Sequence, residues 1–256
     1  MKTTMKTPHA LCGLIALAAV GLLLAPATNA AVVDAHLSST TQILSSANST
    51  LGATLAGVNL YFTNSIAPGS SVNGIFFDNI DMGNPPVGPV SLTANQPGVS
   101  LAISLPGARD NSQRTLGPSI SGTDAATANT LLRDISYLGT GNNTPDSFLF
   151  SGLGANQPVY VQSVGGGVWN GMLQVVANSS PIGTWTSSAS GPAIYGFDTI
   201  TDSSGNLRLD YTIAPGGDFS GLAGIIIAPT PEPTSAALLL GSGAMLLLRR
   251  RRAAAR

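Results

Sequence analysis

The middle of this 256-residue chain is divided into many short runs of β-forming residues, and this pattern limits its fold more than any other feature. Between residues 31 and 228, Gly, Pro, Asn and Asp interrupt these runs at intervals of roughly 8 to 15 residues, which is typical of sandwiches and barrels. In Leu207–Ile213, apolar residues alternate with Arg208, Asp210 and Thr212. One face of that strand should be buried and the other wet. We predict an all-β fold, a single β-sandwich over residues 31–228.

About ten strands and one helix are expected in this domain. Besides Leu207–Ile213, the predicted strands are Ala53–Phe62, Val72–Phe77, Val87–Leu92, Val99–Leu105, the segment around Phe148 and Phe150, Val159–Val164, Met172–Ala177, Ile194–Ile200 and Leu222–Ile227. Apolar residues recur at intervals of three and four from Ala128 to Leu138, with Thr123 or Asp124 as cap and Gly139 just past the end. This spacing predicts one amphipathic helix that covers the core. The loop-rich segment Pro106–Gly122 precedes it.

The charges are few and unevenly distributed. The chain has 11 Lys and Arg against 12 Asp and Glu, but both lysines lie in the first ten residues and five arginines in the last eight. Between residues 31 and 228, four arginines face eleven aspartates. A protein that binds nucleic acid needs the opposite sign of charge, so the sequence predicts no nucleic-acid partner.

The first thirty residues have the order of an export signal. Lys2 and Lys6 precede the uncharged apolar run 11–24, and Pro26 separates this run from the small residues 27–30. We predict a signal helix cleaved by signal peptidase after Ala30, with Ala27 as the fallback. The alternative, a retained membrane anchor, is disfavoured because fourteen residues are short for a span. The only cysteine, Cys12, lies inside the apolar run, so the mature chain would have no thiol.

The last residues combine a proline motif, an apolar run and a basic cluster. Pro231, Glu232 and Pro233 precede the apolar run 236–248, and Arg249, Arg250, Arg251 and Arg252 follow it. The two prolines disfavour helix at the motif, and the arginines are expected to remain on the cytoplasmic side of the membrane. A hydrophobic helix over this run would be about 20 Å long, which makes a marginal span. The open alternative is an ordinary tail anchor.

This tail, residues 229–256, resembles the PEP-CTERM sorting signal of Gram-negative bacteria. The resemblance implies that exosortase, a membrane protease, recognises the tail. It also implies transient anchoring of the precursor in the inner membrane, followed by release to the cell surface or the extracellular space. In that family the route is linked to bacteria that produce exopolysaccharide.

The second half of the middle region resembles the galactose-binding-like jelly rolls of exported bacterial proteins. The motifs that carry this resemblance are Asn129–Asp134 with Tyr137–Gly139, Phe148–Leu153, Val159–Val161, Gly205–Leu209 and Gly221–Ile227. They cover about 100 residues and are loose strand-and-turn patterns. The resemblance implies a jelly-roll form of the sandwich and leaves its ligand open.

Catalytic chemistry has little support in the sequence. His36 is the only histidine after the signal segment, and no lysine follows Lys6, so a Ser-His-Asp triad and Schiff-base chemistry are disfavoured. Eleven aspartates leave a two-carboxylate glycosidase formally open. No cofactor is expected except structural calcium. Its candidate ligands are Asp198, Asp202 and Asn206, whose alternative role is to cap turns.

The two tryptophans provide the candidates for sugar stacking. Trp169 lies beside Asn170, and Trp185 lies between two threonines. Each tryptophan could instead belong to the core. We therefore expect a non-enzymatic exported protein of the cell surface or extracellular matrix, with exopolysaccharide as a candidate ligand. The alternative is a secreted carbohydrate-active enzyme or its carbohydrate-binding module.

Overall fold

The computed structural model describes residues 33–44, 51, 53–62, 65–106, 111–113, 120–138, 144–166, 172–186, 192–217 and 220–230. They belong to one compact unit, Ala30–Pro231. The predicted signal segment with Ala30, and the predicted sorting residues Pro231, Glu232, Pro233 and Arg249 to Arg252, lie outside the described residues. Within the described ranges, no helix is long and apolar enough to cross a membrane.

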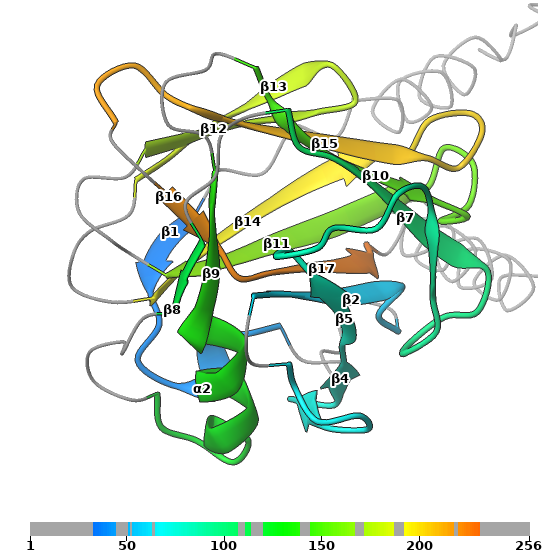
Figure 1. The fold of residues 1–256 in the computed structure, drawn as a ribbon. Helices are drawn as coiled ribbons and strands as arrows, with labels where there is room; N and C mark the ends of the chain where they lie inside the picture. Colours follow the sequence, from blue (N-terminus) through cyan, green and yellow to red (C-terminus); the bar gives the residue numbers. More distant parts are fainter. Residues whose placement is uncertain are drawn as a thin grey trace, which may run out of the picture. The chain divides into compact units, whose positions relative to one another are not determined.

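Two six-stranded sheets form most of this unit (Figure 1). The central sheet has, in spatial order, β1 (Val33–His36), β14 (Pro192–Ile200), β11 (Pro158–Gly166), β17 (Gly224–Pro229), β2 (Ala56–Tyr61) and β5 (Asp78–Asp81). The outer sheet has β13 (Ser180–Thr186), β12 (Met172–Ala177), β15 (Leu207–Ile213), β10 (Asp146–Ser151), β7 (Val99–Ser104) and β6 (Val90–Leu92). Neighbouring strands are antiparallel except β2 and β5. The predicted β-sandwich is confirmed.

The main core lies between the two sheets and is built from alternate residues of each strand. In β15, Leu207, Leu209 and Tyr211 are buried, while Arg208 is exposed, as the alternation predicts. Aromatic rings fill the centre: Trp185 and Tyr195 stack with their centroids 5.9 Å apart. The Tyr211 hydroxyl and Ser163 Oγ lie 2.7 Å apart and join the sheets by a buried hydrogen bond. The core therefore combines close packing with at least one polar link.

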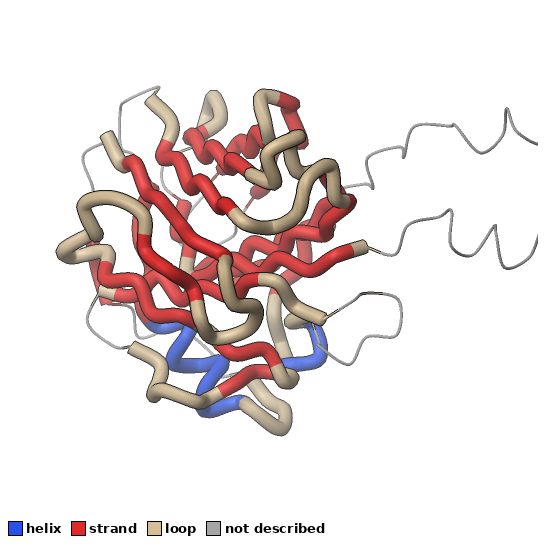
Figure 2. Tube along the Cα trace, turned by 90° about the vertical axis from the view of Figure 1, so that its right-hand side faces the viewer, coloured by secondary structure: helices blue, strands red, loops and turns tan. Residues whose placement is uncertain are grey.

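A further layer covers the opposite face of the central sheet. It contains the 3₁₀ helix η2 (Thr40–Gln42), the hairpin strands β3 (Ser71–Val72) and β4 (Ile75–Phe76), and the helix α2 (Ala125–Arg133). The helices are blue in Figure 2. Leu131 and Leu132 of α2 belong to the same buried cluster as Val164 of β11 and Ile226 of β17. The central sheet is thus covered on its second face at β11 and β17, and the amphipathic helix covers the core as predicted.

Side-chain amides connect the irregular parts of this covering layer. Gln162 of β11 accepts the Leu44 N–H at 2.8 Å and donates to the Gln42 carbonyl at 3.2 Å. Asn73 donates to the Ile43 carbonyl at 2.8 Å, and its own N–H donates to the Asp124 carboxylate. These bonds satisfy backbone groups that have no strand or helix partner, so loops can be buried there.

The helix is shorter than predicted, which is a correction. It ends at Arg133, and the chain continues as β9 (Asp134–Leu138) instead of keeping helical spacing to Leu138. Strand β9 pairs with β8 (Asn111–Gln113) and β16 (Ser220–Leu222) in a small third sheet. The segment has one β-branched and one aromatic residue, Ile135 and Tyr137, and ladder bonds on both sides outweigh another helical turn.

Other predicted elements differ mainly at turns. The predicted strand Val72–Phe77 is a hairpin, because Asn73 and Gly74 have φ of 53° and 78°, as a type I′ turn requires. The predicted strand at Val87 begins only at Val90, since Val87 lies among prolines and is fully exposed. Strands β12 and β15 have the predicted bounds. Strands β1, β5, β8, β9, β13 and β16 were not predicted.

Candidate functional site

Of the residues predicted to stack on sugars, only Trp185 lies within the described part of the chain, and it lies in the core. Its side chain is 0% exposed and stacks on Tyr195. A Cβ added at Gly165 would overlap the Trp185 ring, so the backbone of β11 also passes directly against it. A ring enclosed in this way has no face for a sugar, and the core alternative holds for Trp185. Trp169 and Asn170 lie outside the described residues.

Two of the predicted calcium ligands form a turn. Asp202 Oδ1 accepts hydrogen bonds from the backbone N–H groups of Ser204 and Asn206, both at 2.8 Å, and Asp202 Oδ2 accepts one from Asn206 Nδ2 at 3.2 Å. The bond from the Asn206 backbone is the main reason that the pKa of Asp202 lies below its usual value. Both residues therefore cap the turn between β14 and β15.

The third predicted ligand, Asp198, lies on β14 opposite Tyr160 of β11. Partial burial raises the pKa of Asp198. Burial also raises the pKa of Tyr160, and the charge of Asp198 adds to that increase. In the part of the chain that the structure describes, no three His, Cys, Asp or Glu side chains come together in a group that could hold a metal ion. Calcium binding at these positions stays a prediction.

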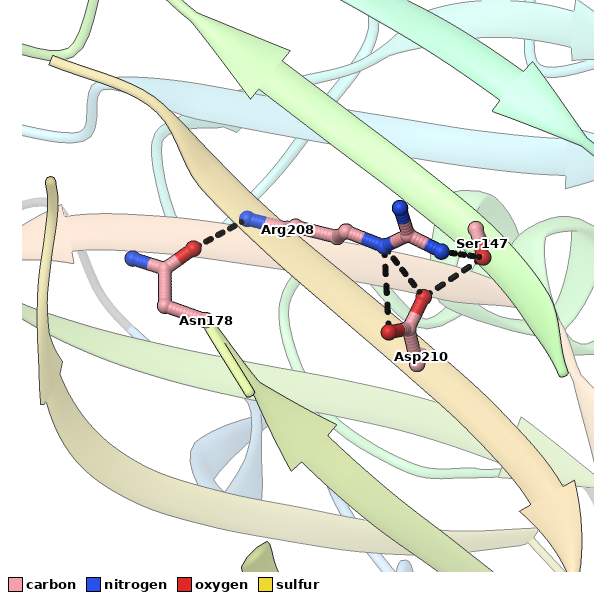
Figure 3. Close-up of polar contacts among 4 residues, drawn as sticks. All are labelled: Ser147, Asn178, Arg208 and Asp210. Carbon is pink, nitrogen blue, oxygen red and sulfur yellow. Dashed lines mark hydrogen bonds and ion pairs between the residues drawn. The ribbon is translucent and has the colours of Figure 1, made fainter. Parts of the chain in front are cut away.

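A charged hydrogen-bonding cluster lies instead on the outward face of the outer sheet, where Ser147 is buried beneath two charged side chains (Figure 3). Ser147 of β10 and Asp210 of β15 are direct cross-strand partners. Ser147 Oγ donates to Asp210 Oδ1 at 2.5 Å, and Arg208 Nη2 donates to Ser147 Oγ at 3.0 Å. Arg208 Nε donates to both Asp210 oxygens, at 2.8 and 3.0 Å. We call Ser147, Arg208 and Asp210 the outer-face cluster.

The hairpin between β12 and β13 fixes the backbone beside this cluster. Its two turn residues, Asn178 and Ser179, have φ of 45° and 67°, as a type I′ turn requires. Asn178 Oδ1 accepts the Arg208 N–H at 2.8 Å (Figure 3). The Asn178 N–H donates to the Arg208 carbonyl at 2.9 Å. Asn178 Nδ2 donates to the Ile200 carbonyl at 3.0 Å. Asn178 therefore fixes the backbone at the start of β15.

The outer-face cluster presents both signs of charge to solvent. The Arg208 side chain is 53% exposed and that of Asp210 17% exposed. Figure 3 shows one terminal nitrogen of Arg208 directed away from both of its partners. Leu149, the cross-strand neighbour of Arg208, is 38% exposed and adds an apolar surface beside the charges. The site can thus donate and accept hydrogen bonds and contact carbon, while its own ion pair keeps it neutral.

The sequence contains part of the signal for this cluster. Arg208 and Asp210 lie two residues apart on the wet face of the clearest predicted strand, so their shared face could be inferred. The contribution of Ser147 and Leu149 could not, because it depends on the register between β10 and β15, which are separated by 55 residues or more in the chain.

Comparison with known proteins gives no family assignment. No family model matches the chain, and no curated protein matches it. Among solved structures, a Bacteroides uniformis β-glucuronidase 2 has a TM-score of 0.42 at 9% identity, covering 69% of this chain and 18% of its own. A family 35 carbohydrate binding module from an environmental isolate has a TM-score of 0.33 at 16% identity, with 50% and 89% covered. A CBM35 from Paenibacillus barcinonensis has a TM-score of 0.29 at 13% identity, covering 50% of this chain and 96% of its own. At these TM-scores the likeness carries no argument about function.

Proposed function

We propose that this chain is a non-enzymatic exported protein of the cell surface or extracellular matrix that binds polysaccharide on the open face of its outer sheet. The observation that carries the proposal is the outer-face cluster with Leu149 beside it. The cluster supplies charge-assisted donors and acceptors, which form stronger hydrogen bonds than neutral groups. Sugar hydroxyls both donate and accept, and the C–H groups of a sugar ring pack on apolar side chains.

The shape of this face favours a polymer over a small molecule. Ligand pockets for small molecules are concave and enclose most of the ligand. The outer-face cluster lies instead on the surface of a six-stranded sheet, where a single sugar would keep much of its surface in water. A polymer compensates for weak individual contacts, because linked units raise the effective concentration of each following contact. Attachment to a polysaccharide matrix therefore suits this surface better than turnover of a small substrate.

Export and tail processing form the delivery part of the proposal. The Thr230 N–H donates to the Pro158 carbonyl at 3.0 Å, so the folded sheet reaches the residue just before Pro231. We infer that signal peptidase cleaves after Ala30 and that an exosortase-type protease reads Pro231 to Pro233 while the apolar run lies in the inner membrane. Replacement of these three residues with alanine should make the uncleaved precursor accumulate there.

Mass spectrometry of the mature C-terminus tests this delivery route. In a strain that carries exosortase, a chain still ending at Arg256 would contradict it. Neutral replacements of Arg249 to Arg252 serve as the comparison. They should impair membrane placement, because a short span loses its cytoplasmic anchor. An ordinary tail anchor would respond only to the arginine changes.

Affinity electrophoresis of the exported protein tests binding. Native gels that contain soluble polysaccharides of the producing strain should retard the protein, and gels without polysaccharide should not. Incubation of the same polysaccharides with the protein should release no reducing ends. Unretarded migration with every polysaccharide would overturn the binding proposal, and reducing ends that increase with time would support the enzyme alternative.

A further inference from the structure

The strand register extends the outer-face cluster into two parallel rows. In the polar row, Ser147 lies opposite Asp210 on one side and Ser104 of β7 on the other. In the second row, Leu149 lies opposite Arg208 on one side and Ala102 of β7 on the other. Both rows cross β15, β10 and β7 at right angles to the strands. Residues two apart on one face are about 6.6–6.8 Å apart, so the rows are separated by about the width of one sugar ring.

We propose that these two rows form a track for a neutral polysaccharide that lies across strands β15, β10 and β7. A sugar ring covers Leu149 and Ala102 with its C–H groups, and its hydroxyls reach Asp210 and the exposed Ser104 in the polar row, while the buried Ser147 holds Asp210 in place. This inference rests on the proposed function. It adds the class of the polysaccharide, the direction in which the polysaccharide crosses the strands, and the residues that contact it.

The charges of the site favour a ligand without net charge. Arg208 is bonded to both carboxylate oxygens of Asp210, so its charge is already compensated. An acidic sugar bound to Arg208 would place its carboxylate close to the carboxylate of Asp210, and the two negative charges would repel each other. The sequence between residues 31 and 228 also has eleven aspartates and four arginines, which repels a polyanion at longer range. Neutral hydroxyls meet neither penalty, and they match a site that has donors and acceptors in balance.

Two substitutions separate the roles of the rows. Leu149→Ser removes the apolar surface and should weaken binding of a neutral polysaccharide on the order of tenfold. Ile200→Ser is the matched control, because Ile200 is a β14 residue of the central sheet that is 50% exposed. Asp210→Asn keeps an oxygen that can accept from Ser147 and Arg208 but removes the compensating charge. That variant should gain binding to an acidic polysaccharide, and added salt should reverse the gain.

The experiment uses affinity electrophoresis of the exported protein and its variants. The neutral probes are soluble glucans, galactans and mannans, and the acidic probe is polygalacturonate. Thermal melts identify any variant that fails to fold; in that case Leu149→Ala and Ile200→Ala replace the serine pair. Selective weakening by Leu149→Ser and gain of polygalacturonate binding by Asp210→Asn would support the track.

Three results would overturn it. Equal weakening by Leu149→Ser and Ile200→Ser would show that the rows are not the contact surface. Equal binding of neutral and acidic polysaccharides by the unmodified protein would show that the ion pair does not select the ligand. Both of these leave polysaccharide binding itself in place. Absence of binding to any polysaccharide would overturn the proposed function, and the track with it.

Discussion

The two sheets differ on the faces that point away from their shared core. On the central sheet, that face packs Val164 and Ile226 against α2 and the other covering elements. On the outer sheet, the corresponding face exposes Arg208 and Leu149. The strands record this difference in their sequences. Strand β15 alternates between apolar and polar residues, whereas β17 is apolar on both faces and buried along almost its whole length. A strand without alternation therefore indicates a covered face as well as a core face.

The covered face also depends on polar groups of a particular kind. The segments that cover it contain short helices and two-residue strands, so many backbone groups have no ladder partner. Gln162 and Asn73 supply these partners from their side chains. On the open face, water can satisfy such groups, and the polar side chains of the outer-face cluster bond to one another instead. The difference between the faces teaches that burial, and not strand content, decides what a polar side chain does here.

The largest expected difference in stability is between two leucine-to-alanine variants, one on each face. Leu131→Ala in α2 empties space in the covered layer, where Leu131 is 0% exposed, and should lower the free energy of unfolding by about 2–5 kcal/mol. Leu149→Ala on the open face should change it by no more than about 0.5 kcal/mol. Urea unfolding of both variants measures the difference. Equal losses would mean that the two faces are not distinct in stability.

A matched pair of glutamines tests the polar part of the comparison. Gln162→Leu should leave the buried Leu44 N–H and Gln42 carbonyl without their partner, at a cost of about 1–3 kcal/mol. Gln174→Leu on the exposed face of β12 is the control and should be nearly neutral. Hydrogen exchange gives a local readout. If the Leu44 amide keeps its protection in Gln162→Leu, that side chain does not hold the covering layer in place.

The sequence predicts the fold best where the pattern within one strand decides the structure. Strand β15 is predicted with its bounds because its alternation is complete over seven residues. The Val72–Phe77 segment is apolar enough to predict a strand, but the Asn73–Gly74 turn signal inside it decides the structure. From Asp134 to Leu138, helical spacing continues, yet pairing with two distant strands makes the segment a strand. Such pairing cannot be read from local spacing.

The site divides along the same line. Arg208 and Asp210 lie on one strand, so their common face follows from alternation alone. Ser147 and Leu149 join them only through the register of β10 with β15. Trp185 was a candidate because of its residue type, but type does not specify which side of β13 points inward. Burial of Trp185 is decided by contact with Gly165 and Tyr195, both on the other sheet.

A smaller effect is expected at the hydrogen bond that crosses the main core. Tyr211→Phe should lower stability at neutral pH by about 1 kcal/mol, because Ser163 Oγ loses its partner. Burial raises the pKa of Tyr211 above its ordinary value of 10.0. The stability linked to the neutral hydroxyl is therefore complete below pH 10 and lost as the pH rises further, because the unfolded chain ionises first. Tyr211→Phe should lose less stability than the unmodified protein between pH 9 and about 11.

Ser163→Ala is the control for this pH dependence. Ser163→Ala removes the same hydrogen bond but keeps the ionisable hydroxyl of Tyr211. This variant should therefore still lose stability as the pH rises. Thermal melts of the three proteins between neutral pH and about pH 11 measure both effects. Parallel curves for Tyr211→Phe and the unmodified protein would show that the Tyr211 hydroxyl does not contribute to the alkaline limb.

The smallest effect is expected at the exposed turn between β14 and β15. The pKa of Asp202 is lowered, chiefly by the Asn206 backbone N–H, so the stability from its charge is present above pH about 4 and lost as the pH falls. Asp202→Asn should therefore flatten the acid side of the stability curve slightly.

Asp198→Asn, on β14, should change the pH dependence of stability in the opposite direction. The pKa of Asp198 is raised by burial, so its charge costs stability as the pH rises, and the amide should gain relative to the carboxylate. Melts from pH 3 to about 7, with and without EDTA, measure both variants. If EDTA lowers the melting temperature of the unmodified protein but not that of Asp202→Asn, the carboxylate holds calcium and the turn is a metal site.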